Sequence, residues 1–192
     1  MGNAKGKPPG AGKSSFDLID PNKFFAALVI KPHMKILDLA CGQGNYTLAL
    51  AEAMGPEGVV YGADLWEEGL AKLREEAAIR GLRQIRAILA DVSSPLPLDA
   101  ASIDLCLMAT VLHDLVEAGT APGALAETTR LVKPGGTLAV VEFKKMDGPP
   151  GPPRHIRLAP EEVENLLKPY GFRKRLIEEI GSYTYLMLFR KV

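Results

Sequence analysis

Residues Ile36–Gly55, ILDLACGQGNYTLALAEAMG, join an apolar run to a helical pattern through a short glycine-rich turn. The apolar run predicts a buried strand, and the pattern after the turn predicts a helix that ends at Gly55. A glycine-rich turn between a strand and a helix commonly holds a nucleotide-like ligand. The turn raises the question of whether that ligand is a dinucleotide, a triphosphate or a molecule without phosphate.

Apolar strands and amphipathic helices alternate along the rest of the chain. This alternation is typical of βαβ units, which build a parallel sheet with helices on both faces. Strands are predicted at 34–40, 58–64, 84–91, 103–110, 136–143, 173–181 and 182–192, and helices at 20–30, 44–55, 66–82, 122–136 and 160–171.

The last two predicted strands are joined by the tight turn Gly181–Ser182. A parallel crossover needs a dozen or more residues, so these two strands must run antiparallel to each other. The sequence therefore predicts an α/β fold with a doubly wound, mostly parallel seven-stranded sheet and one antiparallel strand near its edge.

The composition sets broad limits on function. Among 192 residues, 23 Lys and Arg balance 23 Asp and Glu, so no overall positive field favours DNA. No apolar run is long enough to span a bilayer. Cys41 and Cys106 lie in predicted buried elements without the spacing of metal ligands. We therefore expect no metal site and a reducing, cytoplasmic location.

The N-terminal stretch GKPPGAGKSS is similar to a phosphate-binding loop, but Lys7 stands where the leading glycine is required. No strand precedes it to hold its backbone amides. Residues 1–13 are therefore expected to form a flexible tail, and residues 14–192 a single domain without internal repeats.

Acidic residues follow successive predicted strands, with Asp38, Asp64 and Asp91 at three strand ends. Carboxylates suit ribose hydroxyls, amino groups and a cation better than a polyphosphate. The dinucleotide fingerprint G-x-G-x-x-G is incomplete, because Thr47 occupies the third glycine position after Gly42 and Gly44. Asp64 nevertheless follows at the interval expected of a ribose-binding acid, roughly 20 residues on.

Four motifs together resemble those of class I S-adenosylmethionine-dependent methyltransferases. LDLACGQGN is similar to their first motif, GADL to their ribose-binding motif, ADVSSPLPL to their adenine-binding motif and LVKPGGTLAVVEF to the entry into their fifth strand. The resemblance covers the chain from about residue 20 to its end and is greatest to the small ubiquinone/menaquinone-biosynthesis-type domains. It implies a Rossmann-like methyltransferase fold and S-adenosylmethionine as cofactor, with S-adenosylhomocysteine as product.

The resemblance also implies a set of cofactor-binding residues. The backbone of the turn would pass under the methionine part, with Asp38 facing its ammonium group, and Asp64 would accept the ribose hydroxyls. The full set is Asp38, Ala40, Cys41, Gly42, Gly44, Asp64, Leu65, Asp91, Val92 and Ala109. Structural alternatives stay open, because Asp38 could cap the turn and Asp91 could begin its loop as an Asx residue.

Methyl transfer from a sulfonium mainly requires alignment, and a base is needed only when the nucleophile arrives protonated. His113, just after the fourth predicted strand, is the candidate general base because its ordinary pKa suits proton transfer near neutrality. Alternatively, His113 and Asp114 only begin the next loop and helix. The segment ATVLHDL lacks the Asn/Asp-Pro-Pro-aromatic motif of enzymes that methylate amines of bases or side-chain amides.

The proline-rich segment 144–160 leaves the sheet on the ligand side and concentrates basic residues. Arg154, His155 and Arg157 are candidates for a rim that attracts an anionic acceptor. The alternative is a solvated connector whose charges maintain solubility.

Three functions therefore compete. The favoured one is an S-adenosylmethionine-dependent methyltransferase acting on a small-molecule acceptor. The others are a catalytically silent S-adenosylmethionine-binding module and an NAD-dependent oxidoreductase, which Thr47 and the reversed strands disfavour.

Overall fold

The computed structural model describes residues 12–192, which form one seven-stranded sheet in the order β3-β2-β1-β4-β5-β7-β6. The strands are β1 Lys35–Leu39, β2 Val59–Asp64, β3 Ile85–Leu89, β4 Ile103–Ala109, β5 Val132–Phe143, β6 Phe172–Glu179 and β7 Thr184–Lys191. Strands β1 to β5 run parallel to one another, whereas β7 is antiparallel to both of its neighbours, β5 and β6. The predicted α/β fold, with one reversed strand next to the edge, is confirmed.

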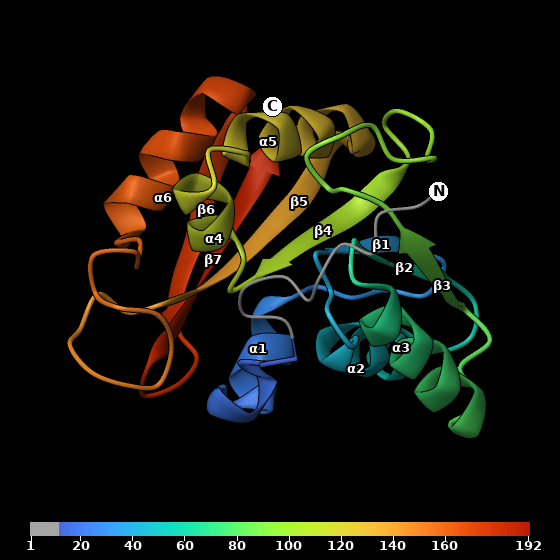
Figure 1. Ribbon diagram of the computed structural model, residues 1–192. Helices are drawn as coiled ribbons and strands as arrows, with labels where there is room; N and C mark the ends of the chain where they lie inside the picture. Colours follow the sequence, from blue (N-terminus) through green and yellow to red (C-terminus); the bar gives the residue numbers. More distant parts are fainter. Residues whose placement is uncertain (1–11) are drawn as a thin grey trace, which may run out of the picture.

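Helices cover both faces of this sheet (Figure 1). They are α1 Pro21–Ala27, α2 Asn45–Met54, α3 Glu67–Ile79, α4 Leu112–Glu117, α5 Ala121–Leu131 and α6 Pro160–Leu167, with short 3-10 helices η1 Phe16–Leu18 and η2 Lys168–Tyr170. Helices α1 to α3 lie on one face, and α4 to α6 lie on the other. Asp20 caps α1, because its carboxylate accepts from the backbone N–H groups of Asn22 and Lys23.

Successive residues of the central strands enter opposite layers of the core. Ile36 packs with the layer under α1 and α2, and Leu37 packs with the layer under α4 to α6. Cys106 and Leu107 on β4 divide in the same way, and all four side chains are fully buried. Parallel strands covered on both faces read as continuous apolar runs, which explains why these segments are so apolar.

The structure differs from the prediction after β4. The helix predicted at 122–136 ends at Leu131, and Pro134 and Gly135 lie inside the long strand β5. The pairing register of β4 and β5 shifts between Ile103 and Leu105, so the regular ladder of hydrogen bonds is interrupted in this part of β5. Pro134, which has no backbone N–H group to donate, is therefore tolerated there. The residues before α5 also form a helix of their own, α4, which contains His113.

The predicted tail, residues 1–13, lies outside the described residues except for Gly12 and Lys13. Within residues 12–192, no helix has the length and apolarity needed to cross a membrane. The same residues contain no cluster of three or more His, Cys, Asp or Glu side chains that could hold a metal ion.

Candidate cofactor and active site

The candidate site lies at the carboxyl ends of β1, β2 and β4, where the chain order of the sheet reverses. Strand β1 pairs with β2 on one side and with β4 on the other, which makes this edge the topological switch point where such sheets bind ligands. Positive φ angles gather here: 61° at Ala40, 58° at Gly42 and 82° at Gly44 after β1, and 52° at Thr110 after β4. Left-handed backbone at a non-glycine residue such as Thr110 often marks a functional site.

Asp38, near the end of β1, is almost fully buried, and its Oδ2 accepts a 2.6 Å hydrogen bond from the hydroxyl of Thr47 on α2. Burial raises the pKa of Asp38 to about 7, and the nearby Asp64 adds to the rise against the effect of the Thr47 hydrogen bond. A cation close to Asp38 would stabilise its ionised form. The turn is therefore better suited to a positively charged group than to a phosphate.

In the dinucleotide fingerprint, the third glycine allows a helix to pack closely on a strand. Here Thr47 occupies that position, and Gly62 on β2 allows the close packing instead. A Cβ atom on Gly62 would lie 2.9 Å from Leu73 Cδ2 and 3.2 Å from Thr47 Oγ1. The small residue thus sits on the strand rather than on the helix. The sequence analysis did not identify Gly62, although a lone glycine inside an apolar strand is a known signal of close approach.

Asp64, at the end of β2, holds the glycine-rich turn in place. Its Oδ2 accepts from the Gly42 N–H at 2.7 Å, and its Oδ1 accepts from the Trp66 N–H at 2.8 Å. An ionised carboxylate has about four acceptor positions, so ribose hydroxyls can be bound in addition to these two amides. Asp64 and the turn are brought together as predicted, and its bond to a ribose stays a prediction.

The other predicted cofactor residues lie around the same strand ends. Oδ1 of Asp91 accepts from the N–H and the hydroxyl of Ser93 at 2.9 and 2.7 Å, which is the Asx turn considered as the alternative. Val92 is buried, whereas Leu65 and Ala109 are half-buried. Burial raises the pKa of the Cys41 thiol, with Asp38 and Asp64 adding to the rise, so this thiol stays protonated.

His113, in the first turn of α4, pairs with a glutamate that the sequence analysis did not single out. Its Nδ1 lies 2.7 Å from Oε2 of Glu142, and its backbone N–H donates to Oε1 of the same carboxylate at 3.1 Å. Glu142 is fully buried near the end of β5. The available signal was a single acidic residue in the apolar run TLAVVEF. On the other side of the ring, His113 Nε2 lies 3.4 Å from Asp114 Oδ1.

A chain of hydroxyls connects the N-terminal segment to the site. Ser15 Oγ lies 2.9 Å from the Tyr46 hydroxyl at the start of α2 and 3.0 Å from Thr110 Oγ1 after β4. The ring of Phe16 also packs edge-on against Tyr46, with centroids 5.0 Å apart. Tyr46 is therefore a core residue, and Ser15 is a further site neighbour that no sequence motif indicated.

The predicted basic rim is corrected at Arg157. This side chain is 1% exposed, and its guanidinium donates to the carbonyls of Lys144, Gly148, Pro150 and Pro152. Such a buried group, bound to the backbone of its own loop, is not available to attract an anionic acceptor. Arg154 and His155 are exposed, as a rim requires.

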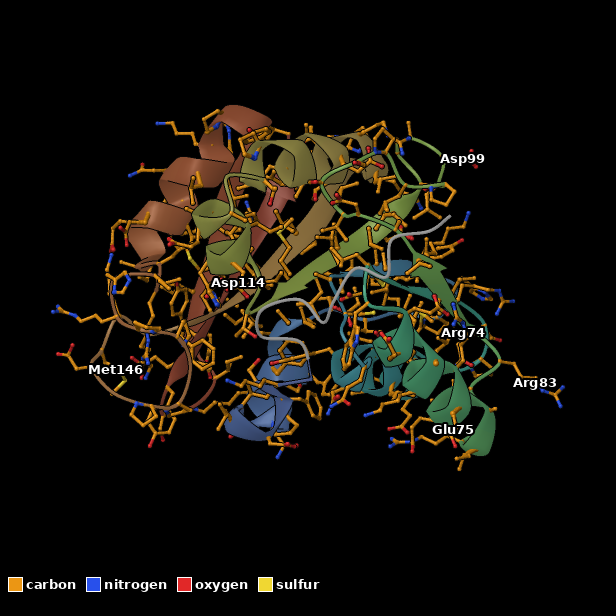
Figure 2. All side chains as sticks on the ribbon, viewed as in Figure 1. Arg74, Glu75, Arg83, Asp99, Asp114 and Met146 are labelled. Carbon is orange, nitrogen blue, oxygen red and sulfur yellow. The ribbon has the colours of Figure 1, made fainter. Side chains whose placement is uncertain are left out.

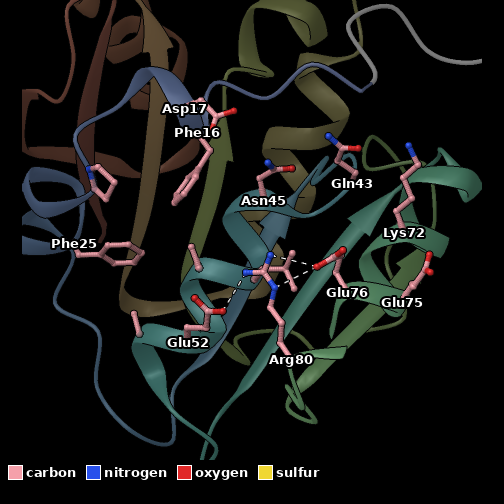
Figure 3. Close-up of a pocket in the computed structure, with 14 residues that line it drawn as sticks. Phe16, Asp17, Phe25, Gln43, Asn45, Glu52, Lys72, Glu75, Glu76 and Arg80 are labelled. Atoms are coloured by element: carbon pink, nitrogen blue, oxygen red, sulfur yellow. Dashed lines mark hydrogen bonds and ion pairs between the residues drawn. The ribbon is translucent and has the colours of Figure 1, made fainter. Parts of the chain in front are cut away.

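A separate groove of about 1000 Å³ lies between the N-terminal segment, α2 and α3 (Figure 3). Phe16, Phe25 and Leu48 line its apolar part. Arg80 bridges its polar part, at 3.2 Å from Glu52 and 3.3 Å from Glu76. Gln43, within the glycine-rich turn, lines the groove, but none of the predicted cofactor-binding residues does. We therefore do not place the cofactor there.

Comparison with known proteins agrees with this geometry. A family described as a methyltransferase domain matches residues 30–180. The demethylmenaquinone methyltransferase of Bacillus cytotoxicus is 34% identical over 113 residues, which are 59% of this chain and 46% of that protein. The ubiquinone/menaquinone biosynthesis C-methyltransferase UbiE of Burkholderia vietnamiensis is 34% identical over 157 residues, 82% of this chain and 60% of that one. The match thus spans about half of the length of these relatives.

The solved structure of a SAM-dependent methyltransferase from Aquifex aeolicus is similar over almost the whole chain. The two share 28% sequence identity with a TM-score of 0.83, and the alignment covers 97% of this chain and 95% of that one. The family match covers most of the chain and includes every strand end at which the site is built. The chain belongs to the methyltransferase domain family.

Proposed function

We propose that this protein binds S-adenosylmethionine at the carboxyl ends of β1 to β4 and transfers its methyl group to a small-molecule acceptor. The observation that carries the proposal is the buried carboxylate of Asp38 beside the glycine-rich turn. A buried carboxylate with a raised pKa is stabilised by a bound cation and would repel a phosphate.

The residues present fit this cofactor. S-adenosylmethionine carries an ammonium, a sulfonium, ribose hydroxyls and adenine, but no phosphate. The residues at the strand ends, 38–44, 64–66, 91–92 and 109–112, include several carboxylates and no Lys or Arg. The residues that would hold the cofactor are Asp38, Ala40, Cys41, Gly42, Gly44, Asp64, Leu65, Asp91, Val92 and Ala109.

The bound cofactor supplies an activated methyl group, so the protein mainly has to align the acceptor with it. Alignment of this kind contributes several kcal/mol to catalysis, with effective molarities of roughly 10⁵ M or more. Asp64 holds the turn through Gly42, which fixes one side of the site. Thr110 and the helix α4 that follows it form the acceptor side.

The acceptor that we propose is a small quinone-type molecule, because the names of two relatives refer to demethylmenaquinone and to ubiquinone/menaquinone biosynthesis. Arg154 and His155 would form the exposed part of the rim through which it enters. A cytoplasmic location is part of the proposal, since the free thiols Cys41 and Cys106 suit a reducing compartment.

Calorimetry followed by a transfer assay tests the proposal. S-adenosylmethionine and S-adenosylhomocysteine should bind in about the micromolar range, a typical cofactor affinity, while NAD gives no heat. Transfer of a radiolabelled methyl group to a demethylated quinol should follow. Binding of NAD in place of S-adenosylmethionine would refute the cofactor, and cofactor binding without transfer to any acceptor would identify a silent binding module.

A further inference from the structure

Three ionisable side chains, Glu142, His113 and Asp114, are linked one to the next from the core to the surface. Glu142 on β5 is fully buried, and the side chain of His113 is 4% exposed. The side chain of Asp114 is 45% exposed. Figure 2 labels Asp114 beside the carboxyl end of β4, from which α4 follows. Asp114 is thus the one of these three side chains that is open to solvent.

The charge of His113 depends on all the groups that face it. Burial by itself lowers the pKa of His113, but the hydrogen bond to Glu142 and the charges of Glu142 and Asp114 raise it above its ordinary value overall. Arg157 opposes this rise from the loop after β5. Arg157 Cζ lies 5.6 Å from the Phe143 ring, and the same ring is 6.2 Å from the imidazole.

The hydroxyl of Tyr185, on β7, also lies near Glu142. Burial is the main cause that raises the pKa of Tyr185, and the charge of Glu142 raises it further, so this hydroxyl stays neutral. Each ring nitrogen of His113 already faces a carboxylate, Nδ1 at 2.7 Å from Glu142 and Nε2 at 3.4 Å from Asp114. His113 is therefore better suited to hold a neighbouring carboxylate than to act as the base.

We propose that Asp114 is the catalytic base that contacts the methyl acceptor, and that His113 and Glu142 are positioning residues behind it. This inference rests on the proposed function and adds a class of acceptor: a neutral molecule with an ionisable hydroxyl, which loses one proton when it is methylated. An acceptor that arrives as an anion would need no base and would be repelled by Asp114.

The reaction step balances in atoms and charge. The acceptor's hydroxyl proton passes to Asp114, and the electron pair that this exposes forms the new bond to the methyl carbon, either at the oxygen or at a conjugated ring carbon. When carbon is methylated, the ring proton returns to the oxygen, so the net loss is again one proton. The electron pair of the broken bond between sulfur and the methyl carbon stays on sulfur, which becomes a neutral thioether. The hydroxyl proton rests on Asp114 Oδ.

The pKa of Asp114 is raised by its partial burial, lowered by His113 and raised again by Glu142, with a net rise. A carboxylate with a raised pKa is a stronger base than an ordinary aspartate. The Nε2 atom of His113, at 3.4 Å, is placed to keep Asp114 in one orientation. Glu142 in turn fixes the imidazole through Nδ1 at 2.7 Å.

Kinetics of Asp114→Asn, with 1,4-dihydroxynaphthalenes of graded acidity as acceptors, test the assignment. At pH 7, kcat should fall about 10²-fold, the usual contribution of a general base. The loss should shrink as the pH rises or as the acceptor becomes more acidic, because an acceptor that is already ionised needs no base. Glu117→Gln is the matched control, since Glu117 is an exposed acid on the same helix. It should keep the wild-type kcat.

A loss of kcat that is the same at every pH and for every acceptor would overturn the role of Asp114 as base. An unchanged kcat in Asp114→Asn would overturn it as well, while leaving the proposed methyl transfer intact. Failure of the unaltered chain to bind S-adenosylhomocysteine would refute the proposed function itself, and the inference with it.

Nitrogen-15 NMR of the imidazole rings gives a readout that needs no acceptor. The pKa of His113 should lie above that of an ordinary imidazole in the wild-type protein, and it should fall in both Asp114→Asn and Glu142→Gln. A pKa at or below the ordinary value would overturn the inference, because His113 could then itself accept the proton.

Discussion

The hydroxyl of Thr47 donates a 2.6 Å hydrogen bond to the buried carboxylate of Asp38. This bond joins the start of α2 to the end of β1 across the glycine-rich turn, so the two sides of the turn are held together by the acid that would face the cofactor. The bond lowers the pKa of Asp38, but burial outweighs it and the pKa is about 7.

The first prediction concerns stability without cofactor. Between about pH 4 and pH 7, the folded protein binds a proton at Asp38 that the unfolded chain has released, so the free energy of unfolding falls as the pH rises through this window. Asp38→Asn removes this dependence. The free energy of unfolding of Asp38→Asn minus that of the wild type, measured with denaturant, should therefore be larger at pH 8 than at pH 5. An equal difference at both pH values would contradict the assigned pKa.

Asp64→Ala should weaken S-adenosylhomocysteine binding at least tenfold. The change removes charge-assisted bonds of about 1.5–3 kcal/mol each and releases the Gly42 and Trp66 amides that position the turn. Calorimetry measures the affinity, and circular dichroism checks that the fold is retained. Glu75→Ala, an exposed acid on α3, should bind like the wild type. Full affinity in a folded Asp64→Ala would leave Asp64 with a structural role only.

Gly62→Ala should reduce the free energy of unfolding by about 1–3 kcal/mol through overpacking. The added methyl group would lie 2.9 Å from Leu73 Cδ2 and 3.1 Å from Cys41 Sγ. Leu73→Val shortens the side chain at this contact. The double variant should lose less stability than the sum of the two single variants, as measured by urea unfolding. Strict additivity would show that the two side chains do not compete for the same space.

Arg157→Lys should loosen the loop after β5. A lysine has three donors on a single atom and cannot reproduce the four bonds that the guanidinium makes to separate carbonyls. We expect a loss of about 2 kcal/mol or more and faster tryptic cleavage within residues 144–157, with unchanged S-adenosylhomocysteine affinity. The exposed Arg154→Lys is the control and should be cleaved like the wild type. Equal cleavage of both variants would show that Arg157 does not hold the loop.

The sequence by itself determined the order of the elements and the position of the glycine-rich turn. Strand and helix periodicity are local properties, and the short turn at Gly181–Ser182 leaves only an antiparallel pairing for β6 and β7. Asp38, Asp64 and the glycine turn could be predicted to meet because the carboxyl ends of parallel strands share one edge of the sheet.

The tertiary structure alone decided which side chains meet across long separations and how exposed they are. Glu142 and His113 stand 29 residues apart, and no local pattern links them. Arg157 has the sequence character of a surface cation, yet its guanidinium makes four hydrogen bonds to backbone carbonyls of the folded loop after β5. Burial and pairing depend on packing between distant segments, and they determine that His113 is buried whereas the adjacent Asp114 stays partly exposed.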